Sequence, residues 1–148
     1  MKSHHLEFPF VKLLARRVPR RHGPRGRSKV ERAMRREAVK SKALRRIVAV
    51  VEAVTASRRI RYQDVMSPRR ETPAIAEARV LAMGLCCALD VPICIVARAF
   101  DRRWHTVYGA EESCSKRYKR SEGFRREWET MSTAVLKQAL EHGKKQQP

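Results

Sequence analysis

Residues 102–108 bring together side chains whose chemistry suits contact with nucleic acid. A guanidinium can bind a phosphate or donate two hydrogen bonds to the N7 and O6 atoms of guanine, and a threonine methyl can meet the methyl group of thymine. An imidazole can donate to a phosphate or a base, and a large aromatic ring supplies apolar contact. This stretch therefore predicts a DNA contact made by Arg102, Arg103, Trp104, His105, Thr106 and Tyr108.

The sequence carries no residue pattern typical of an enzyme. A phosphate-binding loop of the form GxxxxGK[ST] is absent, as are an HExxH motif, paired carboxylates and a Ser/His/Asp arrangement. The cysteines have neither the spacing of a zinc finger nor that of a disulfide framework, since Cys86 and Cys87 are adjacent and only Cys94, His105 and Cys114 could be gathered loosely. We therefore expect a non-enzymatic protein without metal or cofactor, with reduced and mostly buried thiols.

The charge of the chain indicates the class of partner. It has 34 Lys and Arg against 15 Asp and Glu, a net charge of +19. Residues 1–46 hold 16 basic residues and 3 Glu, a net of +13, and residues 47–148 hold 18 basic and 12 acidic residues, a net of +6. A basic segment beside a less basic globular unit predicts a nucleic-acid partner, although a solvated tail or one that seeks an anionic membrane would look alike.

No run of about 18 apolar residues predicts a membrane span. We therefore expect no membrane partner and a cytoplasmic, nucleoid-associated protein. The Arg-rich, acid-poor start of the chain allows an organelle-targeting peptide as a minor alternative.

The elements that must position these residues are helical. Residues 1–27 predict a flexible basic arm, because two prolines and two glycines interrupt residues 19–26. A long helix is expected from Ser28, which has the form of a capping box with Glu31. Its first half should protrude into solvent as a basic helix, and Ile47–Val54 should enter the core.

A loop at residues 67–73 should precede a central core helix over residues 73–88, since Pro73 fits the first helical position. A short helix over residues 93–100, a turn at Asp101-Arg102 and a basic helix over residues 103–116 follow. That order is typical of a helix-turn-helix, in which the last of these helices lies in the major groove. We expect an all-α bundle of five to six helices.

With these residues laid out, Ile47–Tyr118 resembles the C-terminal DNA-binding domain of the bacterial replication initiator DnaA, and related small Trp-repressor-like helix-turn-helix proteins. Ser67-Pro68-Arg69-Arg70 stands where that family has a basic loop. Residues 78–85, ARVLAMGL, follow the family block A-R-Q-I-A-M-Y-L, and Ala97-Arg98-Ala99-Phe100 matches the end of the next block. The resemblance covers about half of the chain.

The resemblance implies roles for particular residues. Arg69 and Arg70 would enter the minor groove, Arg79 would hold a phosphate, and His105 and Thr106 would contact bases or phosphates. The family block G-R-D-H-T-T-V is only partly kept, because residues 102–107 read RRWHTV and lack its Asp and second Thr. Either His105 or Trp104 takes the position of the family histidine, so the initiator's own recognition sequence is not carried over.

A last segment, residues 121–148, predicts an amphipathic helix with a short tail. We expect it to dock on the core, with an alternative in which it contacts a second copy of the chain or RNA polymerase through Phe124, Trp128, Met131 and Val135. Trp104 likewise has an alternative, which is to pack the turn before its helix into the core.

Three segments are thus expected: the arm at 1–27, a domain like DnaA domain IV at 28–120, and the C-terminal helix and tail at 121–148. The predicted function is sequence-selective binding of double-stranded DNA, as in a bacterial or phage transcriptional regulator. The alternative is a non-specific nucleoid or RNA-binding protein driven by the basic arm.

Overall fold

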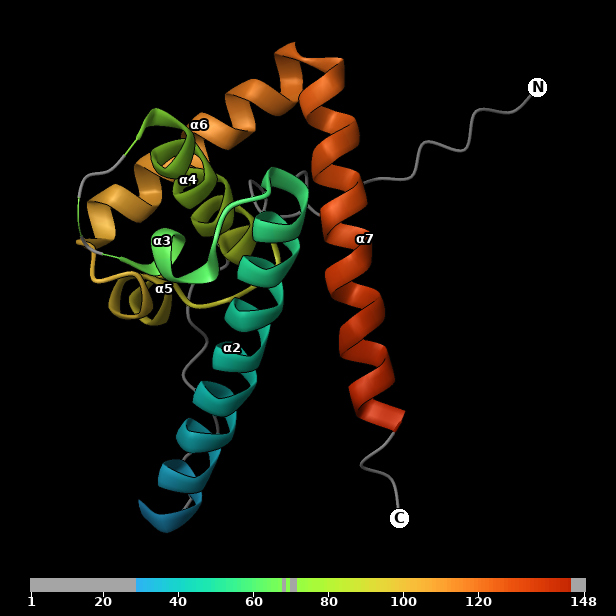
Figure 1. Cartoon of the computed structure of the whole chain (residues 1–148). Helices are drawn as coiled ribbons and strands as arrows, with labels where there is room; N and C mark the ends of the chain where they lie inside the picture. Colours follow the sequence, from blue (N-terminus) through green and yellow to red (C-terminus); the bar gives the residue numbers. More distant parts are fainter. Residues whose placement is uncertain (1–28, 68, 70–71, 145–148) are drawn as a thin grey trace.

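A computed structural model describes residues 29–67, 69 and 72–144 of the chain (Figure 1). This described part is all-helical, with six helices and no strand. The prediction of an all-α fold with five to six helices is therefore confirmed. The predicted arm at residues 1–27 lies outside the described residues.

Helix α2, Lys29–Arg58, is the long helix expected from Ser28. The described side chains of its first half are exposed up to residue 42, whereas Ile47, Val50, Val51 and Val54 are buried. In Figure 1 this first half runs out of the body of the molecule. The predicted division into a protruding basic half and a core half is confirmed.

The core is built around α4, Pro73–Ala88, which has Pro73 in its first turn, where a missing N–H costs nothing. Ten of its residues are buried, and they include the run from Leu81 to Ala88. Because the second half of α4 is apolar on all sides, it is enclosed by α2, α6 and the short helices α3, Tyr62–Met66, and α5, Ile93–Ala99.

The turns after three helices share one backbone conformation, a residue with positive φ and a hydrogen bond that closes the helix end. Arg59, Asp90 and Asp101 follow α2, α4 and α5 and have positive φ values of 54°, 61° and 49°. Across each turn a backbone N–H bonds back to the carbonyl five residues earlier, as in Val91 to Cys86 at 3.0 Å and Arg102 to Ala97 at 2.8 Å. Such caps satisfy the last carbonyls of a helix and fix the direction of the chain that leaves it.

Helix α6, Trp104–Arg120, and α7, Glu122–Lys144, complete the described fold. Helix α6 begins one residue later than the predicted start at 103, because Arg103 is its N-cap, and it continues four residues beyond 116. The extra turn is held by α7, since Arg125 Nε and Nη2 donate to the carbonyl of Tyr118 at 3.3 and 3.2 Å.

The apolar face of α7 packs against α2 and α6. Its large apolar side chains are buried within the chain, which confirms the expectation of internal docking. The alternative contact with a second copy or with RNA polymerase through these side chains is therefore wrong for the folded chain, since they are already covered: Phe124, Trp128, Met131 and Val135.

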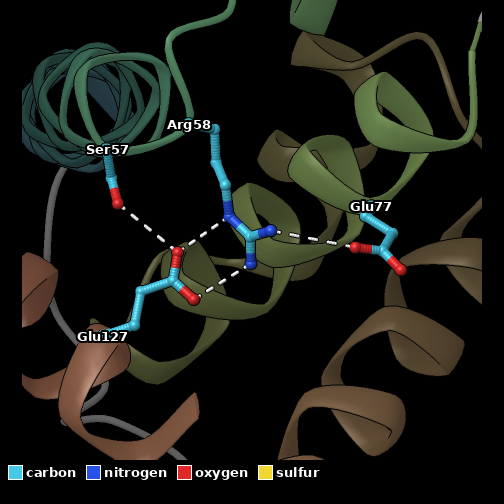
Figure 2. A network of polar contacts seen from close by, with 4 residues as sticks. All are labelled: Ser57, Arg58, Glu77 and Glu127. Carbon is cyan, nitrogen blue, oxygen red and sulfur yellow. Dashed lines mark hydrogen bonds and ion pairs between the residues drawn. The ribbon is translucent and has the colours of Figure 1, made fainter. Parts of the chain in front are cut away.

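One guanidinium joins three helices where α2 ends (Figure 2). Arg58 Nε lies 2.7 Å from Glu127 Oε1 and Nη2 donates to Glu127 Oε2 at 2.9 Å, which ties α2 to α7. Arg58 Nη1 lies 3.8 Å from Glu77 Oε2 on α4, and the Ser57 hydroxyl donates to Glu127 at 3.4 Å. The two-point geometry with Glu127 fixes the angle between α2 and α7 as well as their distance.

Candidate nucleic-acid interface

The amino end of α6 carries an exposed aromatic cluster. Trp104 is 54% exposed and Tyr108, one turn later, is 51% exposed. The Trp104 ring centroid lies 3.4 Å from that of His105 and 5.6 Å from that of Tyr108, which it meets edge-on at 80°. The alternative in which Trp104 packs the turn into the core is therefore wrong.

The first turn of α6 offers backbone donors beside these rings. Its N-cap, Arg103, makes no side-chain cap, and the first amides that bond within the chain are those of Thr106 and Val107, to the Arg103 carbonyl. In the described part of the chain, the amides of Trp104 and His105 consequently have no internal acceptor. Unpaired amides at a helix amino end, together with the helix dipole, suit a phosphate group.

Arginines flank this cluster on both sides of the turn that leads into α6. Arg103 and Arg98 are exposed and Arg102 is half-buried. Arg103 has no carboxylate partner among the described side chains. With Asp101 in the same turn, these three arginines leave a net positive charge in the residues that lead into α6.

The opposite face of α6 fixes the position of this end. Val107, Ala110 and Cys114 are buried at spacings of three and four and pack against α4. The two helices cross closely at Gly84, where an added Cβ would lie 2.6 Å from Cys114 Sγ. Because a glycine is required for this approach, α6 is held close to the central helix and presents its other face outward.

The thiols at this crossing are inert packing groups. Burial raises the pKa of Cys86 well above its ordinary value, and it raises the pKa values of Cys87 and Cys114 to about 12. Cys114 Sγ donates to the Val80 carbonyl at 3.7 Å. The expectation that most of the thiols are buried is confirmed, and Cys94 is the exposed one.

Arg79 lies in a different environment from the one that the resemblance implied. It is only 6% exposed, and its guanidinium donates to the carbonyls of Val65 at 2.8 Å, Asp64 at 2.9 Å and Arg69 at 3.3 Å. These three acceptors are the end of α3 and the loop after it. Arg79 therefore holds this loop from inside.

The candidate basic loop is described only in part. Arg69 is exposed, and its amide donates to the Ser67 hydroxyl at 3.3 Å, while its carbonyl is held by Arg79. Arg70 lies outside the described residues. In the structure, Arg79 therefore binds the carbonyl of Arg69, and the Trp104 ring contacts the rings of His105 and Tyr108. Thr106, in the same turn, is exposed.

The outward face of α6 continues beyond the residues singled out in the sequence. Gly109 has open space where a side chain would be, and Glu112 and Lys116 are exposed and paired at 2.7 Å. This ion pair holds the pKa of Glu112 below its ordinary value. The helical spacing could have predicted that Gly109 and Glu112 belong to this face, since residues four and seven positions after His105 share its side of the helix.

Comparison with known protein families and with curated proteins finds no match for this chain. The resemblance to the DnaA domain therefore stays a prediction from the motifs. None of the described helices is long and apolar enough to cross a membrane.

Proposed function

We propose that this chain binds double-stranded DNA sequence-selectively by inserting the amino end of α6 into the major groove. The observation that carries the proposal is the exposed cluster of Trp104, His105 and Tyr108 beside the open amides of the same turn. Large exposed aromatics are costly on a soluble surface unless a partner covers them. The short helix α5 before α6, joined through the turn at Asp101, supports a helix-turn-helix docking geometry.

In this proposal the residues divide into base contacts and phosphate contacts. Arg103 and His105 are the base readers, because they lie exposed at the first turn, and the open amides of that turn bind phosphate. Arg69, with Arg70 by the resemblance, contacts the minor groove. Arg79 acts as a positioning residue for that loop and makes no phosphate contact itself, since its guanidinium is already engaged by carbonyls.

A regulator of transcription in a bacterium or phage is the biological role that fits such a module. Recognition of single-stranded RNA is disfavoured, because stacking platforms for single strands place aromatics along a groove. Here the three rings cluster at the amino end of one helix.

The experiment is a comparison of two variants on two kinds of duplex. Arg103→Ala and His105→Ala should each reduce the ratio of affinities for a selected site and an unrelated duplex by about 5- to 150-fold, the range of one lost base contact. Lys119→Ala, an exposed cation at the far end of α6, is the matched control and should leave this ratio unchanged. Equal weakening on both duplexes by the α6 variants would contradict base reading.

Non-specific binding is the second candidate function, and the net charge of +19 favours it. Specific duplex readers prefer their site over other DNA by about a thousandfold or more at physiological salt. A ratio near one for every sequence would therefore establish the second candidate.

A further inference from the structure

The protruding half of α2 gathers most of its cationic side chains on one side. At about 100° per residue, seven of the eight Lys and Arg between residues 29 and 46 fall within a sector of roughly 160°. They are Lys29, Arg32, Arg35, Arg36, Lys40, Lys42 and Arg46. We call this sector the α2 basic face. Exposed Val39 also lies in this sector. Four other exposed apolar residues lie on the opposite side together with Glu37: Val30, Met34, Leu44 and Val48.

The α2 basic face points to the same side of the helix as the core does further along. Ala43 and Ile47, which share this sector, are buried, and Arg46 Nη1 donates to the Leu89 carbonyl in the turn between α4 and α5 at 2.7 Å. Helix α2 also packs against α5. Helix α2 therefore passes beside α5, which leads into α6, and its first half extends beyond α5 (Figure 1).

This row is costly for the helix in isolation. Arg32, Arg36 and Lys40 follow each other at spacings of four, where like charges repel. No described carboxylate side chain pairs with the basic face, and the described side chains between residues 29 and 42 are exposed without core contacts to offset the repulsion. A row of phosphates would remove the repulsion and supply the missing partners.

We propose that the α2 basic face is a second DNA-contacting surface, which follows the phosphate backbone of duplex flanking the site read by α6. This inference rests on the proposed function, because the binding of α6 in the major groove determines where the flanking duplex lies. From residue 29 to residue 46 the row is about 25 Å long, which equals about seven base pairs along one strand. Because the row lies on one side of the body, the flanking contact is one-sided.

An anionic membrane is a poorer partner for this surface. An amphipathic helix lies on a bilayer by its apolar stripe. With Val30, Met34 and Leu44 turned to the lipid, the centre of the α2 basic face would point away from the headgroups. Duplex DNA uses the basic face itself and needs no apolar insertion.

The test combines charge-matched variants of the full chain with three duplexes. The α2 variant is Lys29→Gln, Arg32→Gln and Arg36→Gln, and the control is Lys119→Gln, Arg120→Gln and Lys137→Gln, which removes the same charge from exposed sites elsewhere. One duplex contains the selected site alone, and the other two extend it by about eight base pairs, each on a different side. Circular dichroism verifies that both variants remain helical.

The unaltered chain should bind one of the extended duplexes about tenfold more tightly than the short one, and the α2 variant should lose this gain. The slope of log affinity against log salt should fall by up to about 2.7 on that duplex, at about 0.9 for each lost phosphate contact, while the control keeps both the slope and the gain. Site preference should be unchanged.

Equal behaviour of the α2 variant and the control would overturn the inference. So would α2-dependent binding to vesicles containing phosphatidylserine with unaltered DNA affinity. Failure of the proposed function is a separate result, because it is read from site preference in the α6 variants. The salt slope of the α2 variant is measurable on duplex of any sequence.

Discussion

At the scale of single residues, α4 and α6 approach each other closely at Gly84 and Cys114. Gly84→Ala would place a Cβ 2.6 Å from the sulfur and 3.1 Å from the Cys114 Cβ, so the helices must separate. We expect the free energy of unfolding to fall by about 1–3 kcal/mol, the usual cost of overpacking, as measured by urea denaturation.

Gly109→Ala is the matched control on the same helix, since a Cβ there meets nothing within 4 Å. It should leave stability unchanged or raise it by up to about 1 kcal/mol through helix propensity. Equal stability of the Gly84→Ala variant and the unaltered chain would show that α4 and α6 do not cross this closely.

The buried thiols make stability depend on alkaline pH. Burial raises the pKa values of Cys87 and Cys114 to about 12, whereas an unfolded chain ionises its thiols near their ordinary value of about 8.5. Between these values the folded state binds more protons than the unfolded state, so stability is complete below the ordinary pKa and falls as pH rises. Each such thiol adds a slope of up to about 1.4 kcal/mol per pH unit.

Urea denaturation of the unaltered chain and of Cys87→Ala at several pH values from 8 to 11 measures this slope. The variant should have the shallower decline. If the two declines are parallel, Cys87 is ionisable in the folded state and is not buried as described.

At the scale of elements, α7 stabilises the fold through its apolar face. Trp128 is buried and contacts the rings of Phe124 and Tyr118, with centroids 5.8 and 6.5 Å away. Trp128→Ala should lower the free energy of unfolding by about 3–5 kcal/mol, the range for a large aromatic lost from a core. Leu140→Ala, at an exposed position on the same helix, should change it by no more than about 0.5 kcal/mol. Similar losses for the two variants would contradict the docking of α7.

The elements were predictable where local chemistry specifies them. The bounds of α4 follow from Pro73 at its start, and the protruding half of α2 follows from its charge. The extra turn of α6 was not predictable, because the bond from Arg125 to the Tyr118 carbonyl depends on how α7 returns along the body.

The sequence predicted which residues are exposed at the candidate site better than it predicted the contacts that they make. Trp104, His105 and Tyr108 are exposed together at the start of a helix, as their spacing indicated. The burial of Arg79 was not predictable from the sequence. The carbonyls that hold its guanidinium come from residues 10 to 15 positions earlier, in a segment whose path the sequence does not specify.

At the scale of the whole molecule, the packed helices that position α6 and the segments that carry most of the excess positive charge are different parts of the chain. A core of α4 with α2, α6 and α7 fixes the aromatic end of α6, and the excess positive charge lies in the protruding half of α2 and in residues 1–28. In our proposal, α6 supplies selectivity and the basic segments supply salt-dependent attraction.

The measurement that tests this most directly is selection of binding sites from random duplex DNA at near-physiological salt. It compares the full chain with a chain that begins at residue 28. We predict one enriched sequence motif, which the shorter chain retains with weaker affinity and which His105→Ala degrades. No enriched motif for either chain, with affinity that collapses when residues 1–27 are removed, would contradict sequence reading by α6.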